Sequence, residues 1–133
     1  MVEFALTLVI ILVLLAGTVD LGRAIFTYLS LRDAAQEGAS FASYNATVPI
    51  GDIWARACAS SNTVQDLCNT PGALNITRTL GGPGCNGDTV TVTVEYPSFP
   101  LVTPFLGAII GSQTIPIRAS IIDTVLVPPC TTP

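Results

Sequence analysis

The first strong hydrophobic feature of the chain is an uninterrupted run over residues 4–19, with Glu3 before it and Asp20 after it. The run has sixteen residues and no charged side chain. As an α-helix it is about 24 Å long, because each residue adds about 1.5 Å. A helix needs about 20 apolar residues to cross the hydrocarbon core of a bilayer. The pattern therefore predicts a helical segment over residues 2–20 that suits a membrane or another apolar environment.

The helical pattern continues beyond this run, and no proline occurs before Pro49. Apolar residues recur in steps of three and four, as on one face of a helix. They are Leu21, Ala24, Ile25, Tyr28, Leu31, Ala35, Ala39 and Ala42. Polar residues take the other side, and they include Asp20, Arg23, Thr27, Ser30, Asp33, Glu37 and Ser40. We therefore expect one continuous helix over residues 2–44, whose small side chains near residues 34–42 let another element approach closely.

The strongest strand signal lies at residues 89–96, where valines alternate with threonines. Residues 115–121 alternate in the same way, and Pro116 indicates that this strand starts there or lies at a sheet edge. A third, brief strand is predicted at residues 74–78. Together with the long helix, these strands predict an α+β fold in which the helix packs against a small antiparallel sheet. Residues 1–44 form the helix, and residues 45–133 form a separate head.

The segments between the predicted strands are less regular. Residues 53–59 can form a short second helix, whereas residues 60–87 are rich in Gly, Asn, Ser and Pro and are expected to be mainly loop apart from the brief strand. Residues 97–111 are apolar and interrupted by prolines, which is consistent with either a helical turn or a buried loop.

Composition and charge narrow the possible functions. Charged residues make up only 11% of the chain, against about 25% in an ordinary soluble domain. The net charge of −4 disfavours binding to nucleic acids. The chain contains no His and no Lys, which removes the commonest general bases and metal ligands. The acidic residues of the head are scattered, and Asp88 is typical of a turn. We therefore expect no enzyme, no cofactor and no metal site.

All four cysteines lie in the head and none lies in the long helix. An even number of cysteines in a small, loop-rich exported domain predicts disulfides. Of the three possible pairings we favour Cys58–Cys68, which closes a local loop, together with Cys85–Cys130, which ties a Gly-rich loop to the C-terminal tail. A zinc site is disfavoured because closely spaced cysteine pairs are absent.

Two acceptor sequons for N-glycosylation occur in the head. They are Asn45-Ala46-Thr47 and Asn75-Ile76-Thr77. Such triplets also arise by chance, so Asn45 and Asn75 are candidate modification sites only.

The N-terminal third of the chain resembles the TadE-like pilins and pseudopilins of the type IV pilus superfamily. The resemblance rests on the Val2-Glu3-Phe4-Ala5-Leu6 start, the apolar run, the Asp20-Leu21-Gly22-Arg23 segment and the small residues at 34–39. One departure concerns the glutamate, which is usually fifth after leader cleavage in this family and is third here. Either two residues precede Met1 in the mature protein or cleavage differs.

The resemblance implies a role for particular residues in filament assembly. Glu3 would meet the α-amino group of a neighbouring subunit, here Met1, because a lone carboxylate in an apolar setting is costly unless it is paired or protonated. The alternative is that Glu3 merely favours the helix N-terminus. Leu8, Leu12 and Leu15 would pack in the filament core. Asp20 and Arg23 would form a helix-surface or intersubunit pair, or else an ordinary solvated one.

The function implied by the resemblance is that of a structural pilin subunit. The chain would lie in the inner membrane before assembly, meet a prepilin peptidase and the pilus assembly machinery, and polymerise with identical copies. The product would be an extracellular type IV or Tad-like pilus filament on the cell surface that serves attachment. The alternatives are a minor pseudopilin of an assembly or secretion machine and a single-span membrane-tethered binding domain.

Overall fold

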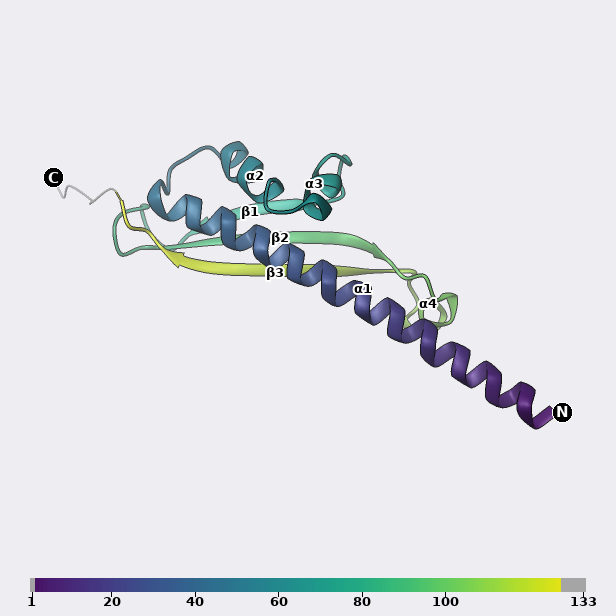
Figure 1. Ribbon diagram of the computed structural model, residues 1–133. Helices are drawn as coiled ribbons and strands as arrows, with labels where there is room; N and C mark the ends of the chain where they lie inside the picture. The colour runs from purple at the N-terminus through teal and green to yellow at the C-terminus, as the bar shows by residue number, and fades with distance from the viewer. Residues whose placement is uncertain (1, 128–133) are drawn as a thin grey trace.

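The computed structural model describes residues 2–127, apart from the side chains of residues 104–106. Its elements follow the order α1 (Val2–Tyr44), α2 (Ile50–Cys58), α3 (Asn62–Cys68), β1 (Asn75–Leu80), β2 (Thr89–Pro100), α4 (Pro104–Ile110) and β3 (Thr114–Thr124). The N-terminal part of α1, residues 2–19, projects away from the rest of the molecule and is called the stalk. The remainder of α1 lies across a three-stranded sheet (Figure 1). The predicted α+β fold class is confirmed.

The helix α1 is continuous over 43 residues. At about 1.5 Å per residue it is roughly 64 Å long. Gly17 and Gly22 lie within it without interrupting it, and a Cβ atom at either position would meet no other atom within 4 Å. The extent predicted from the sequence, residues 2–44, is therefore correct.

The sheet has the order β1-β2-β3, and both pairs of strands are antiparallel. The predicted alternation in β2 is confirmed, because Val90, Val92 and Val94 are buried against the helices. β2 continues beyond the predicted end to Pro100, past an irregularity in its register between Tyr96 and Phe99. β3 lies at a sheet edge, as Pro116 indicated.

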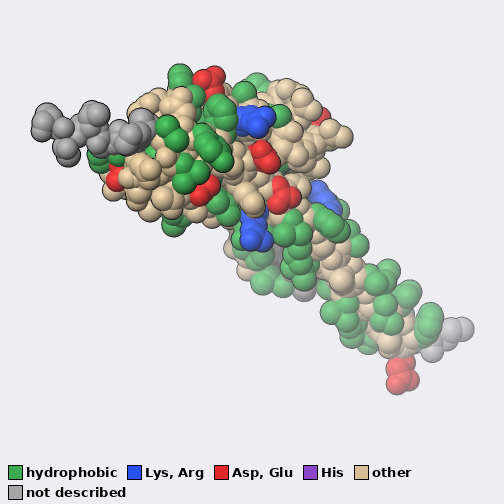
Figure 2. Space-filling view, turned by 60° about the vertical axis from the view of Figure 1, so that its left-hand side comes forward, with side chains coloured by type: hydrophobic (Ala, Val, Ile, Leu, Met, Phe, Trp, Pro, Cys, Tyr) green, Lys and Arg blue, Asp and Glu red, His purple; other side chains and the backbone are tan. Residues whose placement is uncertain are grey.

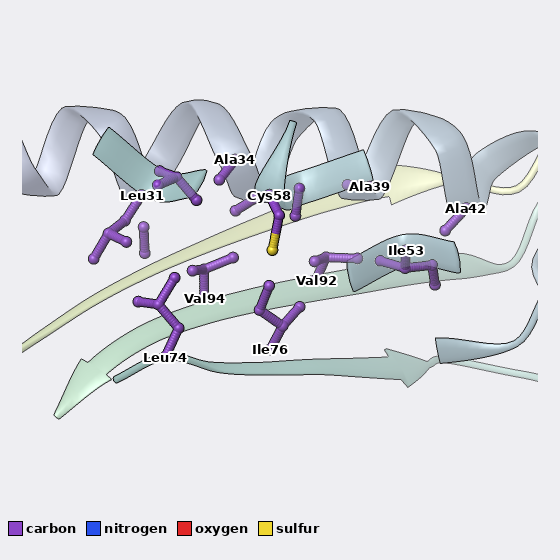
Figure 3. Close-up of a cluster of buried hydrophobic side chains, with 14 of the residues drawn as sticks. Leu31, Ala34, Ala39, Ala42, Ile53, Cys58, Leu74, Ile76, Val92 and Val94 are labelled. Carbon is purple, nitrogen blue, oxygen red and sulfur yellow. The ribbon is translucent and has the colours of Figure 1, made fainter. Parts of the chain in front are cut away.

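The core lies between the C-terminal half of α1, the inner face of the sheet and α2. Figure 3 shows Ile76, Val92 and Val94 pointing from the strands toward the helices. Gly38 lies where α1 comes close to these elements: a Cβ atom there would stand 3.2 Å from Ile53 Cγ2 and 3.2 Å from Val92 Cγ1. Small side chains in this half of α1 therefore permit the close packing that the sequence predicted.

One part of the predicted stripe on α1 is wrong. Leu21, Ile25 and Tyr28 were expected on the packed face, but their side chains are exposed. In this part of α1 the head covers the face that carries Asp20, whereas the later members of the predicted stripe are buried as expected; they are Leu31, Ala35, Ala39 and Ala42. Periodicity identified an apolar stripe, but near the stalk the head covers a neighbouring face.

The connections also differ from the sequence prediction. Residues 60–87 were expected to be mainly loop, yet they contain α3, whose N-terminus is capped by Ser61 through a hydrogen bond from the Val64 N–H to Ser61 Oγ (3.2 Å). α2 begins three residues earlier than predicted, directly after Pro49. Of the two options for residues 97–111, the helical turn is correct, because residues 104–110 form α4 and the side chains of Ile109 and Ile110 are exposed.

Candidate anchoring and assembly surface

The stalk of α1 contains no buried residue, and only Ala16 and Gly17 at its base are partly covered. By length and composition α1 is apolar enough to cross a membrane. Its most apolar stretch of 18 residues is 0% buried within the subunit. Leu8, Leu12 and Leu15, the residues expected in a filament core, are all exposed. Figure 2 shows hydrophobic side chains along the stalk. An apolar helix of this length without a partner requires either lipid or other protein around it.

Glu3 lies in the first turn of α1. Its backbone carbonyl accepts a hydrogen bond from Thr7 Oγ1 at 2.9 Å. No charged residue follows until Asp20, so Glu3 places one carboxylate at the tip of an apolar rod. Met1, its expected partner in a neighbouring subunit, lies outside the described residues.

Asp20 occupies the junction between stalk and head. Only 2% of this residue is exposed. Its Oδ1 accepts a hydrogen bond from the Val102 N–H at 3.1 Å, and its Oδ2 accepts one from the Thr103 N–H at 2.8 Å. The Arg23 guanidinium lies 3.6 Å from Asp20 Oδ1 and 5.3 Å from the centre of the Phe99 ring. Asp20 therefore holds the residues that directly precede α4 beside α1.

These contacts correct the expected role of Asp20. The predicted pair with Arg23 is present within the helix, but it is not an ordinary solvated pair, because the carboxylate is turned into the head and also held by backbone groups. Sequence spacing identified Arg23 as a neighbour one turn away. It carried no signal for Val102 and Thr103, which follow Asp20 by 82 and 83 residues.

Loss of the Asp20 carboxylate is expected to destabilise the head. In Asp20→Ala the two N–H groups lose their acceptor, and a buried donor without a partner costs about 1–3 kcal/mol. We expect a corresponding fall in the free energy of unfolding, measured by denaturant titration of the full chain in detergent. Asp33→Ala, which removes an exposed acid from the same helix, is the matched control and should leave stability nearly unchanged. Coincident unfolding curves for both variants would contradict this role.

Above the junction, α1 carries an exposed apolar face, which continues the stalk toward the head. It consists of Leu21, Ile25, Phe26, Tyr28 and Leu29. Two shallow hollows lie along this part of α1, beside β3. One is lined by Ala24, Ile25, Tyr28, Pro116, Ile117 and Arg118, and the other by Gly17, Asp20, Leu21, Ala24, Leu101, Ile110 and Ile115. The surface available for anchoring or assembly therefore extends beyond the predicted residues 2–20.

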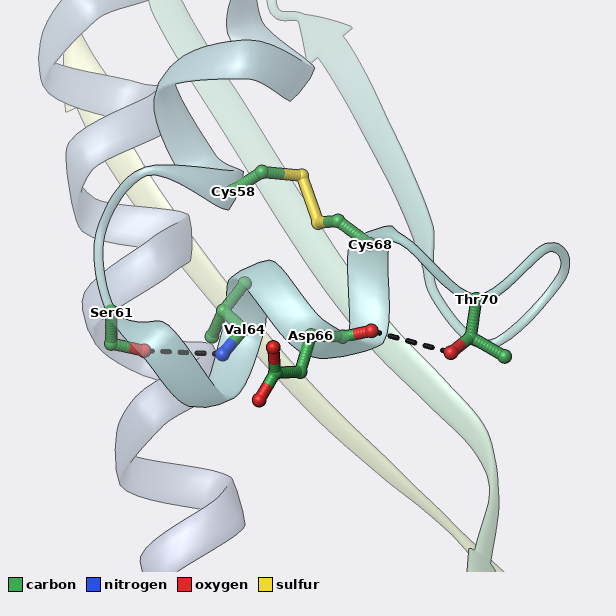
Figure 4. Close-up of a disulfide and its surroundings, with 6 residues drawn as sticks. All are labelled: Cys58, Ser61, Val64, Asp66, Cys68 and Thr70. Carbon is green, nitrogen blue, oxygen red and sulfur yellow. Dashed lines mark hydrogen bonds between the residues drawn. A yellow bond between two sulfur atoms is a disulfide. The ribbon is translucent and has the colours of Figure 1, made fainter.

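The cysteines Cys58 and Cys68 form a disulfide with a Cα–Cα distance of 6.0 Å, the pairing that the sequence favoured. Figure 4 shows that it joins the end of α2 to the end of α3. Val64, whose N–H donates a hydrogen bond to the N-cap Ser61 Oγ, is fully buried in the core. The predicted Cys85–Cys130 pairing includes a residue outside the described part of the chain.

Removing the Cys58–Cys68 bridge is expected to loosen α3. A double Cys58→Ser, Cys68→Ser variant should lose about 2–4 kcal/mol of stability, because the bridge restricts the unfolded chain. Limited proteolysis should then cut within residues 59–73, and mass spectrometry of unreduced peptides from the parent should recover the Cys58–Cys68 link. Two alkylatable thiols at these positions in native protein would exclude the bridge.

Other candidate residues of the head have ordinary surroundings. Asn45 and Asn75 are both exposed, and Thr47 Oγ1 lies 3.3 Å from Asn45 Oδ1 within the first sequon. Asp88 accepts hydrogen bonds from the N–H groups of Gly84 and Cys85 at 2.9 and 2.8 Å, which is the turn role that the sequence indicated. Within residues 2–127 no group of three or more acidic or cysteine side chains is placed to hold a metal ion.

The fold defines a class of proteins in which one long N-terminal helix, apolar enough in its first half to cross a membrane, continues into a small α+β head. Within that class, the family model described as TadE-like protein matches residues 1–40, which include the stalk and most of the part of α1 that packs on the head. The N-terminal region of this chain is therefore TadE-like, and the resemblance seen in its motifs is confirmed. No curated protein and no solved structure matches the chain.

Proposed function

We propose that this chain is a structural subunit of a Tad-like pilus, which polymerises through its apolar N-terminal helix into an extracellular filament for surface attachment. The observation that carries the proposal is the stalk, whose uncharged run contains no buried residue and is exposed apart from the partly covered Ala16 and Gly17. The TadE-like match over residues 1–40, which includes this run, supports it. The chain acts as a building block and not as an enzyme.

The same helix serves two successive environments in this proposal. Before assembly it lies in the inner membrane, where a prepilin peptidase and the assembly machinery meet it. After assembly it is buried among identical helices, and the head forms the outer layer of the filament. Both environments remove apolar surface from water, so the transfer between them does not require the stalk to become soluble.

The test is electron microscopy of material sheared from cells that express the chain with an epitope at the C-terminus of the head, combined with peptide mapping. Antibody labels at regular intervals along filaments, and peptides of this chain as the main component, are the expected result. Labels only at filament ends, or at the cell envelope, would instead indicate a minor pseudopilin. Filaments without label, together with the full amount of chain in the membrane, would favour a membrane-tethered binding domain.

A further inference from the structure

The uncharged run of α1 is shorter than a bilayer. Its sixteen residues give about 24 Å of helix at about 1.5 Å per residue. The hydrocarbon core is about 30 Å thick, which requires about four more residues. If residue 4 lies at one boundary of the hydrocarbon, the other boundary lies near Arg23. The junction between stalk and head is therefore at the level of the membrane, not above it.

At this level α4 lies directly beside α1. Ile110 of α4 lines the same hollow as Gly17 and Leu21 of α1. The backbone that leads into α4 is bonded to Asp20 through the Val102 and Thr103 N–H groups. Figure 1 shows α4 at the stalk end of the head, next to α1. A membrane that covers α1 up to residue 23 must therefore also meet α4.

The outer surface of this part of the head suits such a contact. Val102, Ile109 and Ile110 are exposed by 66%, 67% and 56%. Residues 96–117, which contain α4 and both of its connections, include no charged side chain. Large exposed aliphatic side chains on a surface without charge are unfavourable in water and favourable in the outer part of a bilayer.

The charge of Asp20 opposes a hydrocarbon boundary beyond residue 19, but the contacts of this carboxylate reduce the cost. A carboxylate near hydrocarbon is costly when it is unpaired. Here Asp20 is covered by the head, accepts two backbone N–H groups and lies near the Arg23 guanidinium. Arg23, Tyr28 and Arg118 then stand at the height of the lipid headgroups, where arginine and aromatic side chains are favoured.

We propose that α4 is a membrane-seated foot of the head, which enters the headgroup region and the adjoining acyl chains beside α1 and shields Asp20 there. The inference rests on the membrane stage of the proposed function. Its occupant is the lipid surface itself. In the proposed filament, α4 faces the identical subunits that replace lipid around the junction.

The experiment measures the depth of single tryptophans in the full chain. Trp54 is the one tryptophan of the protein, so Trp54→Phe provides the background for single probes. Two separate variants, Ile109→Trp and Val102→Trp, test the foot at exposed positions. Leu12→Trp reports on the stalk. Ile122→Trp, on an exposed position of β3, is the matched control on the head. Each protein is reconstituted in vesicles of phosphatidylcholine and phosphatidylglycerol, with and without brominated acyl chains.

For a membrane-seated foot, Ile109→Trp and Val102→Trp both emit at shorter wavelength than Ile122→Trp and lose intensity in brominated lipid, as Leu12→Trp does. If only Leu12→Trp is quenched, the proposal that α4 sits in the membrane is wrong, whereas the membrane stage of the proposed function is unaffected. Short-wavelength emission of the foot probes without quenching means that another copy covers α4, which also overturns the proposal. Absence of quenching at Leu12→Trp would contradict the membrane stage of the proposed function itself.

Discussion

Alanine at Leu8, Leu12 and Leu15 together is expected to abolish filaments while the protein still inserts into the membrane. In the subunit these side chains are exposed and contact no part of the head, so the fold of the head does not depend on them. In a packed filament core each truncation costs about 2–5 kcal/mol, and every subunit repeats the defect. Lipid, in contrast, adapts to the shape of the helix, and the remaining run is still strongly apolar. Membrane fractionation and filament counts in parallel measure the two effects.

The matched control replaces the same three leucines with methionine. Volume-conserving exchanges of this kind usually cost less than about 1.5 kcal/mol, so filaments should persist at reduced or normal yield. If the alanine variant forms filaments as well as the methionine variant, the stalk does not build a packed core. The membrane-tethered binding domain would then be the better account of the protein.

Glu3→Ala is expected to leave the protein in the membrane and to reduce filament yield strongly. Glu3 is the sole acid among residues 2–19, and in an apolar filament core it needs a cationic partner. The chain has no Lys or His, so the α-amino group of a neighbouring subunit is the available cation besides arginine. Removal of one member of a buried ion pair costs about 3–5 kcal/mol, since the other member stays buried without compensation.

Two variants separate charge from shape in this test. Glu3→Gln keeps the size of the side chain but not its charge, and should lose filaments as Glu3→Ala does. Asp52→Ala removes an acid from the exposed surface of the head and should have no effect on assembly. Filament counts for all three variants, normalised to the membrane pool, give the comparison. Normal filament density from Glu3→Gln would show that the carboxylate has no part in assembly.

The elements with a strong local pattern could be predicted from the sequence. An uncharged run followed by small residues in steps of three and four predicted α1 with its observed ends, residues 2–44. The valine–threonine alternation predicted β2 and its buried face. These features are local, because side chains three or four apart share a helix face and side chains two apart share a strand face. α3 was missed because its short polar sequence has no such period, and its stability depends on the Ser61 cap, on buried Val64 and on the Cys58–Cys68 bridge.

The sequence by itself determined the apolar stalk, the α+β class of the head and the TadE-like N-terminal region. Only the tertiary structure decided which side of α1 the head covers near the junction, and hence that Leu21 and Ile25 are exposed while Asp20 is buried. Periodicity defines the faces of a helix but not the element that will pack on each of them. That choice depends on contacts between distant segments, such as Asp20 with Val102 and Thr103. The same long-range contacts place α4 beside the junction between stalk and head.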